Sequence, residues 1–157
     1  MKTVLITGGT RGIGLSTAIN FQQKGWEVYI TSRKQENLDL VIKEYPELKG
    51  FVARADDLAA ASETCMKIKD ETVSLDVLIN NAGTNPSGGS LMDVELSAVQ
   101  KTWDVNLMGP LMWTREAVKA GLSESVLNVC SVGGIRPSQY MGAYNISKAG
   151  LIYMTRQ

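Results

Sequence analysis

The fold of this chain is decided by a glycine-rich stretch near its start, Thr7-Gly8-Gly9-Thr10-Arg11-Gly12-Ile13-Gly14. An apolar run, Val4-Leu5-Ile6, precedes it, and residues 15–21 continue from it with helical spacing. A buried strand that passes through a glycine turn into a helix is typical of a dinucleotide pyrophosphate site, because the free N–H groups of the helix N-terminus face the anion. Structural turns between strands and helices also use glycine, so the stretch alone leaves both interpretations open.

The rest of the chain alternates strand and helix patterns. We expect further strands at residues 26–31, 50–53, 75–80 and 125–130, and further helices at residues 35–45, 59–72, 96–120 and from 141 onward. This alternation predicts parallel βαβ units, and therefore an α/β fold with a Rossmann-type doubly wound parallel sheet in three layers. Ligands of such sheets bind beyond the carboxyl ends of the strands, where the polar clusters of this chain fall.

Length and composition restrict the class of protein. The 157 residues, 44% of them apolar, predict a single domain over residues 1–157 with enough apolar side chains to bury a core. Sixteen basic and sixteen acidic residues cancel, so we expect neither a nucleic-acid nor a membrane partner. The chain has no histidine, which excludes His-based metal sites and Ser-His-Asp hydrolysis, and we expect no metal.

The two cysteines, Cys65 and Cys130, lie far apart in the sequence. We interpret them as buried free thiols of a reducing compartment, and so expect a cytoplasmic protein. Met1-Lys2 leads directly into the first strand, which is not the pattern of a signal peptide.

Basic residues follow the second predicted strand, where an acidic residue would bind the ribose hydroxyls of NAD. The sequence there is Ser32-Arg33-Lys34, without a carboxylate before Glu36. Together with Arg11 of the glycine turn, Arg33 and Lys34 can neutralise a 2′-phosphate, so we expect NADP(H) rather than NAD(H). The alternative is that they are solvated bases on a surface loop.

An acidic pair follows the third predicted strand. Asp57 could accept a hydrogen bond from the adenine amino group, with Leu58 against the ring. A helix N-cap explains Asp56 or Asp57 equally well.

Tyr144 and Lys148 are four residues apart on a predicted helix and therefore share one face. A free tyrosine, with a pKa of about 10, is a poor acid–base catalyst at neutral pH, and a neighbouring cation favours its phenolate. Ser131 directly follows the fifth predicted strand and could donate a hydrogen bond to a substrate carbonyl. An ordinary amphipathic pair and a turn serine would look the same. Tyr140 and Tyr153 have no cation at the matching position.

In these motifs the chain resembles the short-chain dehydrogenase/reductase family. The resemblance covers the whole chain and is carried, in family order, by Thr7-Gly8-x-x-x-Gly12-x-Gly14, Asn80-Asn81-Ala82-Gly83, Asn106, Ser131 and Tyr144-x-x-x-Lys148.

The resemblance implies reversible hydride transfer between NADPH and a carbonyl of the ketone or 3-oxoacyl type. Tyr144 would give or take the hydroxyl proton, and Lys148 would favour the phenolate of Tyr144. Ser131 would hold the carbonyl oxygen, and Asn106 would support a water molecule that relays protons. The residues expected to bind the cofactor are Gly8, Thr10, Arg11, Gly12, Ile13, Gly14, Ser32, Arg33, Asp57, Leu58, Asn81, Ala82, Gly83, Tyr144 and Lys148. Ser32 stands where NAD-dependent members carry an acid.

The sequence stops at Gln157, inside the predicted catalytic helix, whereas family members run to roughly 250 residues. We therefore expect a C-terminally incomplete form. A homodimer or homotetramer is what the resemblance implies for a complete chain. The alternative function is a non-catalytic fragment that binds cofactor or a full-length partner. Residues 86–90 and 133–141 are expected to flank a substrate pocket whose ligand the sequence does not identify.

Overall fold

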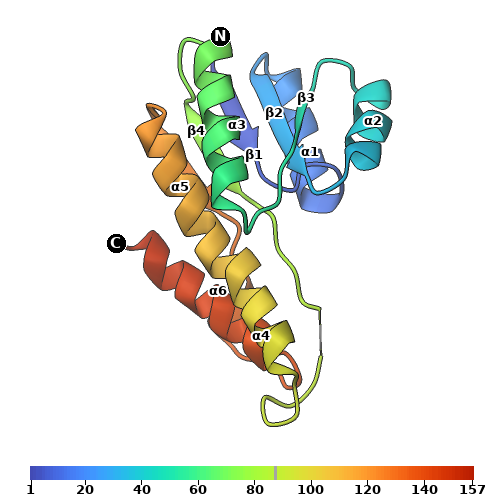
Figure 1. The fold of residues 1–157 in the computed structure, drawn as a ribbon, viewed down its shortest axis with the longest axis vertical. Helices are drawn as coiled ribbons and strands as arrows, with labels where there is room; N and C mark the ends of the chain where they lie inside the picture. Colours follow the sequence, from blue (N-terminus) through green and yellow to red (C-terminus); the bar gives the residue numbers. More distant parts are fainter. Residues whose placement is uncertain (87) are drawn as a thin grey trace.

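A parallel sheet forms the central layer of the chain in a computed structural model that describes residues 1–86 and 88–157 (Figure 1). Ser87, in the predicted 86–90 loop, lies outside the described residues. The strands found within those ranges are β1 (Thr3–Ile6), β2 (Glu27–Ser32), β3 (Lys49–Val52), β4 (Val77–Asn80) and β5 (Ser125–Asn128). Their order across the sheet is β3-β2-β1-β4-β5, and each neighbouring pair is parallel. The predicted Rossmann-type α/β fold is confirmed, with the reversal of strand order at β1.

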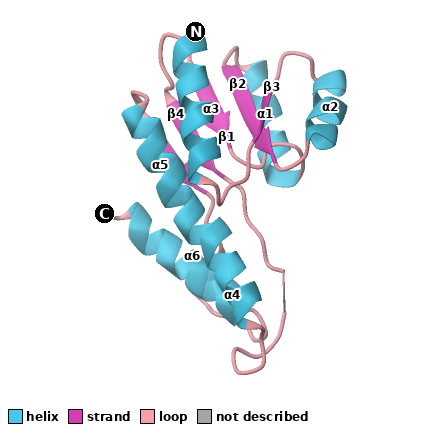
Figure 2. Cartoon of the chain, in the orientation of Figure 1, coloured by secondary structure: helices cyan, strands magenta, loops and turns pink. Residues whose placement is uncertain are grey.

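Helices cover both faces of this sheet, and further helices extend beyond it (Figure 2). The described α-helices are α1 (Gly12–Gln23), α2 (Gln35–Glu44), α3 (Leu58–Glu71), α4 (Leu96–Trp103), α5 (Gly109–Lys119) and α6 (Gly142–Thr155). A π-helix, η1 (Asp104–Met108), joins α4 to α5, and a short 3₁₀ helix, η2 (Val132–Gly134), follows β5.

The apolar run of β1 divides its side chains between two cores, because successive residues of a strand point to opposite faces. Val4 and Ile6 pack in the core beneath α1 and α2, whereas Leu5 packs in the core beneath α3 and α5. All three are fully buried. This two-sided burial fixes β1 in the middle of the sheet and directs its carboxyl end, and the glycine turn that follows, to the edge where ligands bind.

One prediction of secondary structure is wrong in detail. The expected single α-helix over residues 96–120 is interrupted by η1, where the N–H of Gly109 donates to the carbonyl of Asp104, five residues earlier. Pro110 has no N–H to donate to the carbonyl of Asn106, so the ordinary helical ladder cannot continue through this turn. The wider turn carries Asn106, which is completely buried.

Both cysteines are free thiols; Cys65 is buried, and Cys130 is partly buried after the end of β5. Among the described residues, no helix combines the length and the apolar character that crossing a bilayer requires.

Candidate cofactor and active site

The glycine turn between β1 and α1 requires its glycines. Gly8 and Gly12 have φ values of 67° and 54°, a left-handed conformation that side chains disfavour. A Cβ on Gly14 would lie 2.4 Å from the carbonyl oxygen of Gly8 and 2.5 Å from the side-chain nitrogen of Asn81. The turn is therefore closed tightly against its own backbone and against the end of β4.

Asn81 and Thr7 hold the turn in place. The Asn81 side-chain amide donates to the carbonyl oxygens of Thr7 and Gly8, both at 3.0 Å. In return, the Thr7 hydroxyl accepts the backbone N–H groups of Asn81 and Ala82, both at 3.1 Å. At the start of α1, Arg11 makes no side-chain cap, so the first N–H groups of this helix remain available to an anion.

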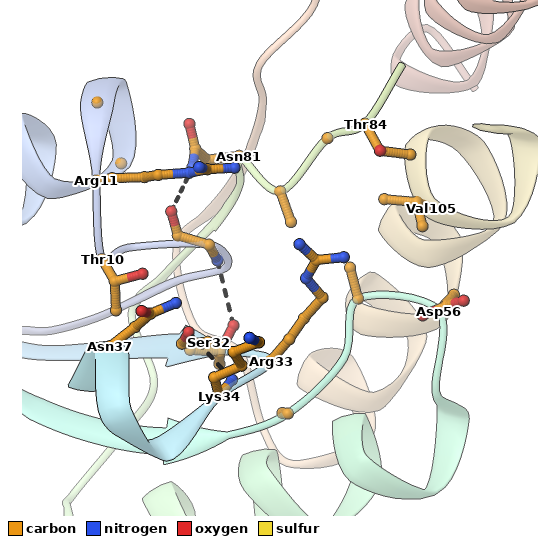
Figure 3. Close-up of a pocket in the computed structure, with 18 of the residues that line it drawn as sticks. Thr10, Arg11, Ser32, Arg33, Lys34, Asn37, Asp56, Asn81, Thr84 and Val105 are labelled. Atoms are coloured by element: carbon orange, nitrogen blue, oxygen red, sulfur yellow. Dashed lines mark hydrogen bonds between the residues drawn. The ribbon is translucent and has the colours of Figure 1, made fainter. Parts of the chain in front are cut away.

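A cavity of about 610 Å³ opens at the carboxyl ends of β1, β2, β3 and β4 (Figure 3). Most of the residues predicted to bind the cofactor line it, namely Gly8, Thr10, Arg11, Gly12, Ile13, Gly14, Ser32, Arg33, Asn81, Ala82 and Gly83. Asp57, Leu58, Tyr144 and Lys148 do not belong to its lining. The Asp57 carboxylate accepts the N–H of Ala60 at 3.0 Å and so caps α3, while Leu58 is half exposed at the first position of that helix.

The side of the cavity next to β2 is basic and polar. Arg11, Arg33 and Lys34 line it, are exposed, and form no ion pair within the described part of the chain. Figure 3 shows Thr10, Ser32 and Asn37 gathered beside them, with the Arg33 side chain extending into the cavity. Free cations beside hydroxyl and amide groups suit a phosphate ester.

The opposite wall was not predicted from the sequence. It includes Ala55 and Asp56 from the loop after β3, together with Lys101 from α4. The Trp113 indole donates to the carbonyl of Ala55 at 3.1 Å, and Asp56 forms ion pairs with Arg54 and Lys101. The sequence offers no signal for Lys101, because its pairing with Asp56 joins residues far apart in the chain.

Asn106 links η1 to the strand-end segment beyond β4. Its side chain exchanges two 2.8 Å hydrogen bonds with the backbone N–H and carbonyl of Thr84, and also donates to the Ser147 hydroxyl at 3.1 Å. The Ser147 hydroxyl in turn donates to the carbonyl of Tyr144 at 2.7 Å. Asn106 thus ties α6 to the cavity wall.

Tyr144 and Lys148 share the face of α6 that was predicted. The Lys148 ammonium lies 5.8 Å from the centre of the Tyr144 ring and donates to the carbonyl of Val129 at 2.7 Å. Burial lowers the pKa of Lys148, against a smaller opposing effect of Cys130. A Cβ on Gly83, which lines the cavity, would lie 3.8 Å from the Lys148 nitrogen, so the lysine stands directly beside the cofactor-sized cavity.

The segment that carries Ser131 packs against α6. The Ser131 hydroxyl oxygen accepts the N–H of Gly133 at 3.1 Å, which leaves its own proton free to be donated. A Cβ on Gly134 would lie 2.8 Å from the carbonyl oxygen of Lys148. Ser131, Tyr144 and Lys148 therefore belong to one packed unit, with Asn106 on its far side through Ser147.

The chain is similar in sequence to known proteins. The family model for short chain dehydrogenases matches residues 2–157. The human dehydrogenase/reductase SDR family member 4 is 34% identical over 166 residues, covering 99% of this chain and 58% of the relative. Tropinone reductase-like 3 of Erythroxylum coca is 29% identical, with 99% of this chain and 62% of the relative covered.

Solved structures give the same result. The F189W actinorhodin polyketide ketoreductase with NADPH superposes with a TM-score of 0.94 at 27% identity, covering 99% of this chain and 62% of that protein. ElxO with NADP bound gives a TM-score of 0.90 at 28% identity, with coverages of 98% and 64%. The chain thus spans about 60% of the length of these relatives, and over that span it belongs to the short-chain dehydrogenase family.

Proposed function

We propose that this chain is the cofactor and catalytic portion of an NADPH-dependent reductase that converts a ketone or 3-oxoacyl carbonyl to an alcohol. The observation that carries the proposal is the group of cations, Arg11, Arg33 and Lys34, that form no ion pair among the described residues and line a cavity beside the glycine turn and the uncapped N-terminus of α1. The crystallised relatives with NADPH or NADP bound support it.

The residues present fit a nicotinamide dinucleotide phosphate. The N-terminus of α1, which the glycine turn leads into, would hold its pyrophosphate, since no side chain caps the first N–H groups of this helix. Arg33 and Lys34, with Thr10 and Ser32, would hold the 2′-phosphate. Asn81, Ala82 and Gly83 would lie along its adenosine side. When bound, this cofactor supplies the hydride.

Side chains of the protein would transfer the proton. Ser131 would donate its free hydroxyl proton in a hydrogen bond to the substrate oxygen, and Tyr144 would transfer its own proton to that oxygen. The positive charge of Lys148 stabilises the phenolate that this transfer leaves behind.

Asn106 would act through its main chain. Because its side chain is already engaged with Thr84 and Ser147, only its carbonyl oxygen is left for a relay water, and Pro110 does not compete for that oxygen.

The test is a calorimetric titration of the 157-residue chain with NADPH and, separately, with NADH. The proposal predicts saturable binding of both, with a preference for NADPH of about tenfold or more from the added phosphate contacts. Equal affinities would contradict the assignment of NADPH. Binding without turnover of simple ketones or 3-oxoacyl thioesters would favour the alternative, a fragment that binds cofactor but does not catalyse.

A further inference from the structure

Asp56 is the one acidic side chain among the described residues that line the cofactor cavity. It lies on the wall opposite the basic residues, and only 12% of its side chain is exposed. A carboxylate in this place is unfavourable for a ligand that carries phosphates, and it attracts any unpaired cation in the same cavity. Asp56 would therefore be expected to pair with Arg33, yet its ion pairs in the described residues are with other cations.

Two cationic side chains already form ion pairs with this carboxylate. Its Oδ2 atom accepts a charge-assisted hydrogen bond from Lys101 of α4 and another from Arg54 at 3.0 Å. Burial acts to raise the pKa of Asp56, but the hydrogen bonds from Lys101 and Arg54 outweigh it, and the pKa lies below its ordinary value. Asp56 is therefore ionised, and its charge is compensated locally.

Arg33 faces the same space without a partner. It is exposed, it forms no ion pair in the described ranges, and its side chain extends into the cavity toward the wall that holds Asp56, Thr84 and Val105 (Figure 3). An arginine fork binds a carboxylate in the same bidentate geometry that it uses for a phosphate, so Asp56 and a 2′-phosphate are competing ligands for Arg33.

We propose that Lys101 is a positioning residue for cofactor selection: by pairing with Asp56, it keeps that carboxylate from binding Arg33 and so leaves Arg33 available to the 2′-phosphate. This inference rests on the proposed function for the identity of the ligand. Lys101 would not contact the phosphate itself. Its effect passes through Asp56 and Arg33 and is specific to the cofactor that carries the additional phosphate.

The experiment is a double-mutant cycle on cofactor affinity in the 157-residue chain. Lys101→Met is expected to weaken NADPH binding about fivefold and to change NADH binding by less than about twofold. The effect on NADPH is moderate because the contact between Asp56 and Arg33, which would compete with the phosphate, is partly exposed to solvent. Asp56→Asn should remove the competitor, so Lys101→Met added to Asp56→Asn should have no further effect. Lys67→Met, which removes an exposed lysine paired to Glu63 on the solvent-facing side of α3, is the matched control.

The cycle separates the alternatives. If Lys101→Met weakens NADPH equally with and without Asp56, the lysine acts on the ligand directly and the inference is wrong. If NADPH and NADH lose affinity alike, Lys101 supports only the shape of the wall, which also overturns it. Failure of the unmodified chain to prefer NADPH would instead count against the proposed function.

A second readout needs no cofactor. In the isotopically labelled chain, the NMR signal of the Arg33 side-chain Nε–H group reports its partner. In the Arg54→Ala/Lys101→Met background, adding Asp56→Asn should shift this signal, whereas Asp56→Asn in the unmodified background should not. An unchanged Arg33 signal in the double-variant background would show that Asp56 does not capture Arg33.

Discussion

Asn106 and Thr84 are joined by a reciprocal pair of hydrogen bonds: the Asn106 amide donates to the Thr84 carbonyl at 2.8 Å and accepts the Thr84 N–H at 2.8 Å. No other residue type of this size offers both a donor and an acceptor in that geometry. The pair fixes the segment after β4 to the π-helix η1, so the cavity wall and α6 are parts of one structure.

Replacing Asn106 by Ala should therefore destabilise the whole domain. The change leaves the partly buried N–H and carbonyl of Thr84 and the buried hydroxyl of Ser147 without this partner, and we expect a loss of about 3 kcal/mol. Urea unfolding followed by circular dichroism measures it. Asn20→Ala, on an exposed face of α1, is the control and should change stability by less than about 0.5 kcal/mol. A loss no larger than that of the control would contradict the proposed role.

Arg33→Ala tests the 2′-phosphate site. Its guanidinium extends into the cavity and forms no ion pair among the described residues, so its removal should weaken NADPH about tenfold or more and leave NADH within about twofold. The measurement is calorimetric titration of both cofactors, with Arg156→Ala, an exposed arginine near Tyr153, as control. Equal weakening of the two cofactors would place Arg33 outside phosphate recognition.

Tyr144→Phe tests the proton donor. In any form of the chain that reduces a carbonyl, loss of this hydroxyl should lower turnover by about a hundredfold or more while NADPH affinity stays the same. Tyr153→Phe, on the same helix but with an exposed ring, is the matched control. Turnover that survives the Tyr144 change would overturn the catalytic assignment.

Asp76 offers a pH test of stability away from the site. Its buried carboxylate accepts the Thr3 N–H and the hydroxyls of Ser74 and Ser123 at 2.6–2.8 Å. Burial acts to raise its pKa, but these hydrogen bonds outweigh it and the pKa in the folded state is lowered. The contribution to stability is thus complete above the unfolded pKa, about 4, and is lost as pH falls through the lower folded value.

Asp76→Asn should consequently cost about 2 kcal/mol at pH 7 and much less near pH 2. Urea unfolding at the two pH values measures the difference, and Asp70→Asn, an exposed aspartate on α3, should show little dependence at either pH. A cost at pH 2 as large as the cost at pH 7 would mean that the ionised carboxylate is not the stabilising species.

The parts that the sequence predicted well are those in which the signal is local. The run Val4–Ile6 and the glycine turn specify a strand, a turn and a helix within about twenty residues, and the parallel doubly wound sheet follows from the alternation of strands and helices that continues after them. The shared face of Tyr144 and Lys148 could also be predicted locally, because residues four apart on a helix lie on the same side.

The missed features depend on contacts between distant segments. Lys101 and Asp56 are 45 residues apart, and a charged residue on an amphipathic helix carries no mark that distinguishes a solvent-facing lysine from a paired one. For Asp57 the sequence left contact with the adenine and an N-cap equally open; its side chain caps α3, while Asp56 lines the cavity. The π-helix η1 did have a local sequence signal, because Gly109-Pro110 stands within a helical stretch. The contacts that Asn106 makes there depend on how α6 packs, which the local sequence does not specify.

The hydrogen bond between the Trp113 indole and the Ala55 carbonyl has an optical consequence. Trp113 is almost completely buried directly behind the cavity wall, whereas Trp26 packs edge-on against Phe21 at the end of α1. The reduced nicotinamide absorbs light where indole emits, so binding should quench tryptophan emission by energy transfer, and a shift of the Ala55 backbone should change the emission of Trp113 in particular. The chain thus carries its own fluorophore, by which occupancy of the cavity can be followed in real time without a label.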